Sequence, residues 1–194
     1  MKIEKVCVYC ASSRQANQVY RDAARKLGEI LASNSITIVY GGGAVGSMGA
    51  LADGALSKDG KVVGIIPRFM VEMEWANRKI SDLIVVNDMA ERKKKMIETV
   101  DAVIALPGGT GTLEELIEAI TWKRLGIYLN PIILMNTLGF FDPCVELLNR
   151  CVSEKFMDEK HKNMWTVLNE PGDVISAILS APEWYKDARH FAAI

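Results

Sequence analysis

A run of glycines that opens a predicted helix gives the sequence its clearest candidate for binding chemistry. Residues 107–111 read PGGTG, and three glycines in so short a loop would let a ligand approach the backbone closely. An apolar run, 102–106, precedes the loop and predicts a buried strand. From Thr112 onward, apolar residues recur with the spacing of one helical face. This order predicts an anion site, because a helix N-terminus carries free N–H groups and a partial positive charge.

The carboxylates behind this loop have two interpretations. Residues 112–115 read TLEE, which fits a capping box in which Thr112 is the N-cap and Glu115 reaches back to the Thr112 N–H. In the second interpretation, Glu115 is a catalytic carboxylate beside the bound anion. The residues alone favour the structural role, because capping boxes are common at helix starts.

A second glycine-rich loop, residues 41–49, follows another predicted strand and reads GGGAVGSMG. It contains the letters of the dinucleotide fingerprint, but the next predicted strand, 62–66, ends in Pro67 instead of the acidic residue that the motif requires. A Walker loop is excluded because Ser47 stands where lysine is needed. Backbone N–H groups of the loop could still bind a mononucleotide or a phosphate. Tight packing of a strand-to-helix turn would explain two of its glycines but hardly all five.

Arg92 is the one residue of a basic run that the helix pattern places on an inward face. Residues 92–95 read RKKK, and the later lysines fit an ordinary solvated face. Arg92, however, lies three residues after Met89 and four before Met96, so these three share one side of the predicted helix. An inward charge near a helix start usually has a partner or a ligand. The run is too short to indicate nucleic-acid binding.

Composition predicts one large domain. The chain has 194 residues, 49% of them hydrophobic, which suits a substantial core. A formal net charge of −1 and a pI near 6.2 give no global positive field for nucleic acid or an anionic membrane. No basic-then-apolar leader begins the sequence, and no apolar run reaches about 18 residues. We therefore expect a cytoplasmic protein without membrane contact.

The four cysteines predict neither a redox motif nor a metal site. Cys7 and Cys10 have C-x-x-C spacing, but they flank an apolar strand pattern, whereas a redox pair usually opens a helix. Cys144 and Cys151 share a face of a predicted helix. No histidine lies near either pair, so zinc is not expected. We interpret all four as small hydrophobic residues of the interior.

Predicted strands and helices alternate along the whole chain, without repeats, low-complexity tracts or linkers. This alternation predicts a single α/β domain over 1–194 with a Rossmann-like, doubly wound parallel sheet. Ligands bind such sheets outside the carboxyl ends of the strands, where both glycine loops would lie. Residues 68–81 read as an irregular connection and 183–194 as a tail. The predicted strands are 6–9, 37–40, 62–66, 83–86, 102–106 and 132–135, and the predicted helices are 20–31, 90–100, 140–151, 173–179 and the one that begins at Thr112.

Three motifs together carry a family resemblance. The pattern P-G-G-x-G-T-x-x-E matches 107–115, M-x-x-R-K matches 89–93, and G-G-G-x-x-G-x-M-G matches 41–49. In these motifs the chain resembles the LOG family of phosphoribohydrolases, which act on cytokinin riboside 5′-monophosphates and long carried the label lysine decarboxylase. The resemblance extends from Cys7 to about Trp165.

The resemblance implies hydrolysis of the N-glycosidic bond of AMP or its N6-prenyl derivative, giving free base and ribose 5-phosphate without a metal or cofactor. It implies a homodimer with the active site near the subunit interface, and Arg92 and Glu115 as the catalytic pair. The expected substrate- and phosphate-binding positions, glycine loops included, are Ser13, Gly42, Gly43, Gly46, Met48, Gly49, Glu74, Lys93, Gly108, Gly109, Thr110, Gly111, Thr112, Glu114 and Thr121.

The chain departs from the family pattern at Ala11, where glycine is commoner, at Ser47, where leucine is commoner, and at Ala90, where histidine is frequent. These departures bear on substrate preference and affinity, because the arginine, the glutamate and both loops remain. Pyridoxal phosphate chemistry would need a lysine beside a phosphate cup, and neither glycine loop contains one. The alternative function is a non-catalytic carrier of a nucleotide or of the molybdenum cofactor, which has no need for the Arg92 and Glu115 pair.

Overall fold

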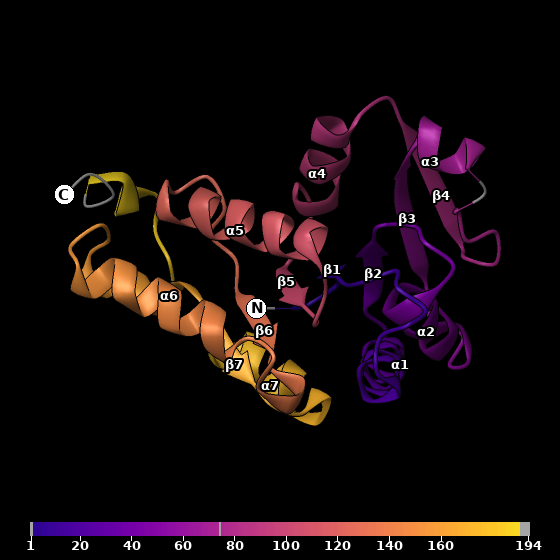
Figure 1. The fold of residues 1–194 in the computed structure, drawn as a ribbon, viewed down its shortest axis with the longest axis horizontal. Helices are drawn as coiled ribbons and strands as arrows, with labels where there is room; N and C mark the ends of the chain where they lie inside the picture. Colours follow the sequence, from indigo (N-terminus) through magenta and orange to yellow (C-terminus); the bar gives the residue numbers. More distant parts are fainter. Residues whose placement is uncertain (1, 74, 191–194) are drawn as a thin grey trace.

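A single parallel sheet organises the computed structural model, which describes residues 2–73 and 75–190. Its strands are β1 Lys5–Tyr9, β2 Thr37–Tyr40, β3 Val62–Pro67, β4 Asp82–Val86, β5 Ala102–Ala105, β6 Ile132–Met135 and β7 Thr166–Leu168. The strand order is β4-β3-β2-β1-β5-β6-β7, and every neighbouring pair is parallel (Figure 1). This topology confirms the predicted Rossmann-like, doubly wound α/β fold. The direction of winding changes between β1 and β5, which is where such sheets bind ligands.

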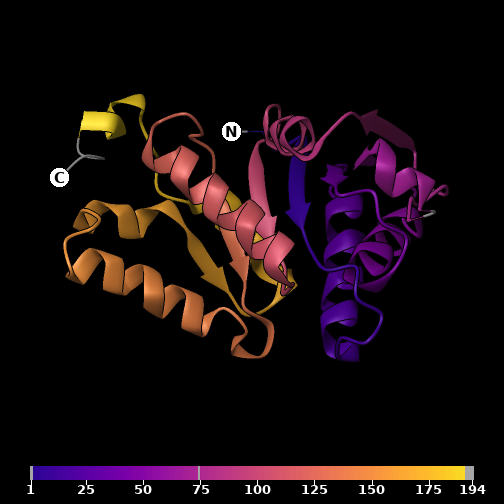
Figure 2. The same ribbon diagram turned by 45° about the horizontal axis from the view of Figure 1, so that its top comes forward.

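Helices cover both faces of the sheet because alternate strand residues point to opposite sides. Val6 and Val8 of β1 pack in one apolar cluster with α1, α2 and α7, whereas Cys7 and Tyr9 pack in a second cluster with α4, α5 and α6. Figures 1 and 2 show α1 and α2 together on one side of the strands. The helices are α1 Gln18–Ser33, α2 Gly46–Leu56, α3 Arg68–Glu72, α4 Met89–Ile97, α5 Thr110–Arg124, α6 Asp142–Ser153 and α7 Val174–Ser180, and the 3₁₀ helices are η1 Thr137–Gly139, η2 Glu159–Met164, η3 Pro171–Asp173 and η4 Lys186–His190.

The six predicted strands are present, and the structure adds elements that the sequence pattern did not predict. Strand β7 has only three residues, none of them fully buried, so it lacks the apolar run that identifies a strand. The helix α3 lies within the predicted irregular connection. Part of the predicted tail is docked, because the Trp184 indole Nε1 donates a hydrogen bond to the Lys123 carbonyl at 2.6 Å and Ala188 is buried. No helix in the described ranges is long and apolar enough to cross a bilayer.

Close packing of α1 against α2 sets the positions of the loops that precede them. A Cβ placed on Gly28 of α1 would lie 2.2 Å from the Leu51 carbonyl oxygen of α2, and one on Gly54 would lie 2.2 Å from the Arg25 carbonyl oxygen. Neither contact is possible for a real side chain, so both helices need glycine at their crossing. The loops after β1 and β2 enter these two helices, and their separation therefore depends on this crossing.

We expect Gly28→Ala to lower the free energy of unfolding by about 1–3 kcal/mol, because overpacking must push α1 away from α2. Gly172→Ala is the matched control, since a Cβ at Gly172 meets no atom within 4 Å, and it should change stability by less than about 0.5 kcal/mol. Urea unfolding of both variants measures the difference. A Gly28→Ala protein as stable as wild type would contradict the close crossing.

Candidate active site

A cavity of about 760 Å³ opens at the carboxyl edge of the sheet, next to the point where β1 and β5 meet. We call it the edge cavity. Loops from both halves of the sheet form its walls, including the loops after β1, β2 and β5, and the starts of α4 and α5. The residues that line it are Cys10, Ala11, Ser12, Ser13, Arg14, Gly41, Gly43, Ala44, Val45, Met48, Ile66, Met70, Trp75, Met89, Arg92, Gly109, Thr110, Gly111, Thr112 and Glu115.

A buried ion pair forms part of the cavity wall. The Arg92 guanidinium of α4 donates from Nη1 to Glu115 Oε1 of α5 at 3.0 Å, and both residues are about 5% exposed. Two backbone carbonyls hold the same guanidinium, because Nε donates to Ile65 at 3.0 Å and Nη2 donates to Gly41 at 3.4 Å. The helix pattern correctly placed Arg92 inward, together with the buried Met96. These contacts fix the direction in which the Glu115 carboxylate faces.

Burial changes the acid–base behaviour of Glu115. Loss of hydration raises the pKa of its carboxyl from 4.5 to about 7, although the adjacent Arg92 guanidinium acts in the opposite direction. Desolvation disfavours the charged form, and an opposite charge favours it. A carboxyl with a pKa near neutrality can accept and release a proton at physiological pH.

The start of α5 differs from the predicted capping box. The helix begins at Thr110, and its N-cap is Gly109, which makes no side-chain cap hydrogen bond. Thr112 is buried within the first turn, and Glu115 is paired with Arg92. The prediction of Thr112 as N-cap with Glu115 as its partner is therefore wrong, because a tertiary partner holds the carboxylate.

The first turn of α5 faces the edge cavity with little side-chain volume. A Cβ at Gly109 or at Gly111 would meet no atom within 4 Å, so packing gives no reason for either glycine. Both residues line the cavity, and both are exposed. A side chain at either position would extend into open space beside the N–H groups of the helix start. This end of α5 therefore has the shape and charge of an anion site.

Backbone geometry and packing explain part of the second glycine loop. Gly46 has a φ of +63°, and a Cβ there would lie 2.6 Å from the Ser12 backbone. A Cβ at Gly49 would lie 2.4 Å from the Ala44 carbonyl oxygen, and one at Gly43 would lie 2.7 Å from the Met48 sulfur. Gly42 has a φ of +78°, which favours glycine without such a close contact, and a Cβ at Gly41 would lie 2.1 Å from Arg92 Nη2. Close contact with backbone atoms therefore accounts for two of the five glycines, Gly46 and Gly49, as expected, whereas a Cβ at 41 or 43 would meet the ends of the Arg92 and Met48 side chains.

The structure brings some of the expected binding positions into the edge cavity and leaves others outside its lining. The positions in the lining are Ser13, Gly43, Met48, Gly109, Thr110, Gly111 and Thr112. Glu74 lies outside the described residues. The positions that do not line the cavity are Gly42, Gly46, Gly49, Lys93, Gly108, Glu114 and Thr121.

Three of the positions outside the lining sit on the outer surfaces of α4 and α5. Lys93 Nζ bonds to Glu114 and lies 3.2 Å from the Glu118 carboxylate. The Glu114 hydrogen bond raises the pKa of Lys93. Thr121 is exposed, and its Oγ1 donates to the Ile117 carbonyl at 2.8 Å.

Sequence patterns missed several residues of the lining, above all Trp75 and Arg14. The segment after α3 pairs with the second glycine loop through an isolated bridge between Gly43 and Ala76, and the Ala44 N–H donates to the Trp75 carbonyl at 3.2 Å. This pairing places Trp75 at the cavity. It arises from a contact between distant segments, so local periodicity gives no signal for it.

The fold and the cavity define the class of the protein: a Rossmann-like α/β protein with a nucleotide-sized cavity at the switch point of its sheet. A family model described as "Possible lysine decarboxylase" matches residues 48–178. A relative from Oryza sativa subsp. japonica, named "Probable cytokinin riboside 5'-monophosphate phosphoribohydrolase LOGL2", is 36% identical over 177 residues, which cover 91% of this chain and 72% of the relative. The Arabidopsis thaliana "Cytokinin riboside 5'-monophosphate phosphoribohydrolase LOG1" is 40% identical over 156 residues, which cover 80% of this chain and 73% of the relative. The chain therefore belongs to the LOG family.

Solved structures share the fold at lower sequence identity. The molybdenum cofactor binding protein from the phototrophic bacterium Rippkaea orientalis matches with a TM-score of 0.70 and 23% identity, over 93% of this chain and 98% of that protein. This similarity concerns the fold alone.

Glu115→Gln should remove a pH dependence of stability. The pKa of Glu115 is higher in the folded protein than in the unfolded chain, so the unfolded chain loses this proton at a lower pH. The free energy of unfolding of wild type therefore falls as pH rises from 4.5 to about 7. Glutamine does not titrate, so the variant should match wild type near the lower pH and exceed its free energy of unfolding by about 1–3 kcal/mol at about pH 8. Urea unfolding at both pH values measures this, with Glu118→Gln as the control. A variant less stable than wild type at the higher pH would show that the ion pair outweighs burial.

Proposed function

We propose that this protein hydrolyses the N-glycosidic bond of a nucleoside 5′-monophosphate, AMP or its N6-prenyl derivative, to free base and ribose 5-phosphate. One observation carries the proposal: the Arg92 and Glu115 pair forms a wall of the same cavity into which the N-terminus of α5 opens. The names of the relatives at 36% and 40% identity support the same reaction.

The cavity offers a separate surface to each part of such a substrate. The 5′-phosphate would bind the first turn of α5, where Gly109 and Gly111 leave the N–H groups accessible. Glu115 lies about 7 Å further along the helix axis, which leaves room for the ribose between phosphate and carboxylate. Apolar side chains, including Met70 and Trp75, would face the base. The substrate would then lie along α5 with its glycosidic carbon at the carboxylate.

Glu115 can serve the reaction in two ways. Cleavage of the bond between C1′ and the base nitrogen passes through an oxocarbenium-like state, and the carboxylate stabilises that positive charge. It also accepts a proton from the water whose oxygen bonds to C1′, while the base leaves with the bonding electron pair and takes up a proton from solvent. Glu115 then releases its proton to solvent, which restores the carboxylate. Arg92 uses one N–H each for Glu115, Ile65 and Gly41, so we assign it chiefly the positioning of Glu115. Of its five donors, two remain for the substrate.

Lysine decarboxylation fits the cavity poorly. That chemistry uses pyridoxal phosphate attached to a lysine, and the described lining of the edge cavity includes no lysine. A molybdenum-cofactor carrier on this fold remains the alternative function. It has no need for a buried arginine and carboxylate aimed into the cavity, and this pair favours the hydrolase.

We also propose that the working form is a homodimer in the cytoplasm. Lys93, Glu114 and Thr121 match nucleotide-contacting positions of the family but lie outside this chain's cavity lining, so a second copy's nucleotide is their natural contact. The exposed Ile117 shares the outer face of α5 with Thr121 and would supply apolar contact area. Sedimentation velocity measures the assembly directly.

Glu115→Gln should abolish base release from AMP while the protein still binds the nucleotide. Loss of a positioned acid–base group lowers the rate by about 10²–10⁴-fold, and glutamine preserves the shape of the side chain. Chromatography of AMP incubated with the protein measures free adenine. Glu118→Gln, one turn further along α5, is the matched control and should keep wild-type activity. Equal adenine release by wild type and Glu115→Gln would remove the catalytic role of this carboxylate.

A further inference from the structure

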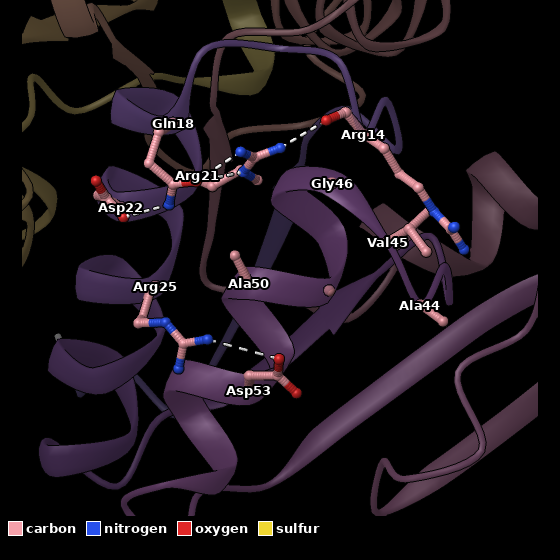
Figure 3. Close-up of a pocket in the computed structure, with 11 residues that line it drawn as sticks. Arg14, Gln18, Arg21, Asp22, Arg25, Ala44, Val45, Gly46, Ala50 and Asp53 are labelled. Atoms are coloured by element: carbon pink, nitrogen blue, oxygen red, sulfur yellow. Dashed lines mark hydrogen bonds and ion pairs between the residues drawn. The ribbon is translucent and has the colours of Figure 1, made fainter.

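A second, smaller cavity of about 340 Å³ lies beside the edge cavity, between α1 and α2. We call it the arginine cavity, because three arginines contribute to its lining. Figure 3 shows their side chains with those of their neighbours. The lining residues fall into two groups: from the β1 loop and α1 come Arg14, Gln18, Arg21, Asp22 and Arg25, and from the second glycine loop and α2 come Ala44, Val45, Gly46, Gly49, Ala50 and Asp53.

Two of the arginines are held in place by contacts that leave donors available. Arg21 donates from Nη1 to the Arg14 carbonyl at 2.6 Å, and from Nε and Nη2 to Gln18 Oε1 at 3.0 and 2.5 Å. Arg25 lies 3.6 Å from the Asp53 carboxylate, which is an ion pair but longer than a hydrogen bond. Each guanidinium has five N–H donors in a planar fork, so both side chains of the lining keep donors that these contacts do not use.

Arg14 connects the two cavities. It lines both of them, as do Ala44 and Val45. Its side chain points away from Arg21 (Figure 3), and its guanidinium forms no hydrogen bond or ion pair with the part of the chain that the structure describes. An anion in the arginine cavity would therefore attract a side chain that also forms a wall of the edge cavity.

The charges of the lining select the kind of ligand. The lining contains three guanidiniums and two carboxylates, and each carboxylate already has a contact: Asp22 accepts from the Gln18 amide at 2.7 Å, and Asp53 pairs with Arg25. The start of α2, at Gly46, adds the partial positive charge of a helix N-terminus, although its Met48 N–H already donates to the Ala11 carbonyl at 3.0 Å. Planar guanidinium forks match the oxygen geometry of phosphate. We propose that the arginine cavity binds a phosphate group.

Two sources could supply this phosphate. It could be a separate small anion such as inorganic phosphate. It could also be the distal phosphate of a nucleotide with a longer 5′ chain, which would start in the edge cavity and pass Arg14. The second source rests on the proposed nucleotide binding in the edge cavity, whereas the first does not.

The test titrates inorganic phosphate into the full chain at constant ionic strength and follows the side-chain Nε–Hε resonances of the cavity arginines by NMR. Wild type should show a saturable shift of Arg21 and Arg25. Arg21→Gln should weaken this binding at least about tenfold, the equivalent of one charge-assisted hydrogen bond. Lys26→Gln is the matched control, because it removes one charge from the same helix outside the lining, and it should alter the affinity by less than about twofold.

Asp53→Asn should increase the phosphate affinity, an effect that a misfolded variant would not produce. Removing this carboxylate frees Arg25 and removes repulsion, so phosphate affinity should rise by at least about threefold. Unsaturable shifts in wild type, or equal affinities in wild type, Arg21→Gln and Asp53→Asn, would overturn the proposal. These outcomes are independent of hydrolase activity and so leave the proposed function to its own test.

A comparison of AMP with ATP separates the two sources. If the phosphate belongs to a longer nucleotide, one equivalent of ATP should shift the Nε–Hε resonances of Arg92 and Arg25 together. Arg25→Gln should then weaken the binding of ATP but not that of AMP. If it is a separate anion, inorganic phosphate should still bind with wild-type affinity when AMP is saturating. Either pattern supports a phosphate site, and the absence of both would contradict it.

Discussion

A buried guanidinium and a buried carboxylate meet at the sheet edge, and the architecture of the site depends on how they are held. Taking two charges out of water costs several kcal/mol for each ion unless each charge finds partners. Arg92 has three, since carbonyls from the β2 loop and from β3 join Glu115 as acceptors. The pair thereby connects α4 and α5 to β3 and to the loop after β2. The rest of the fold shields this ion pair from water on one side, and on the other side the pair lines the edge cavity.

The same burial gives Glu115 its acid–base behaviour. A carboxyl raised to a pKa of about 7 changes protonation state at neutral pH, as catalytic acids and bases do. Its position on α5 also matters, because the N-terminus of that helix attracts an anion. One helix thus presents its N-terminus and the Glu115 carboxylate to the same cavity, where we propose that the phosphate and the glycosidic carbon of the substrate lie. We propose anion binding for the neighbouring arginine cavity as well.

Sequence periodicity predicted the parts of the structure that depend on local pattern. The six strands, the inward face of Arg92 and the strand–glycine–helix order of α5 all followed from residue spacing. The capping box at Thr112 failed because Arg92, distant in sequence, provides the better partner for Glu115. Strand β7 is too short to show a pattern, and Trp75 and Arg14 reach the cavity through loops whose course is set by tertiary contacts. Residue spacing also did not predict that Lys93, Glu114 and Thr121 lie outside the cavity lining, and their roles stay predictions.

The central claim is that a phosphate at the start of α5 holds the ribose against Glu115. Side-by-side measurement of base release from AMP and from adenosine, at equal concentration, tests it most directly. Binding energy from the non-reacting phosphate positions the ribose, so its loss should lower turnover as well as affinity. We expect a kcat/KM for adenosine at least about a thousandfold below that for AMP, equivalent to ~4 kcal/mol. Comparable values for the two substrates would show that the start of α5 binds no phosphate and would contradict the phosphoribohydrolase proposal.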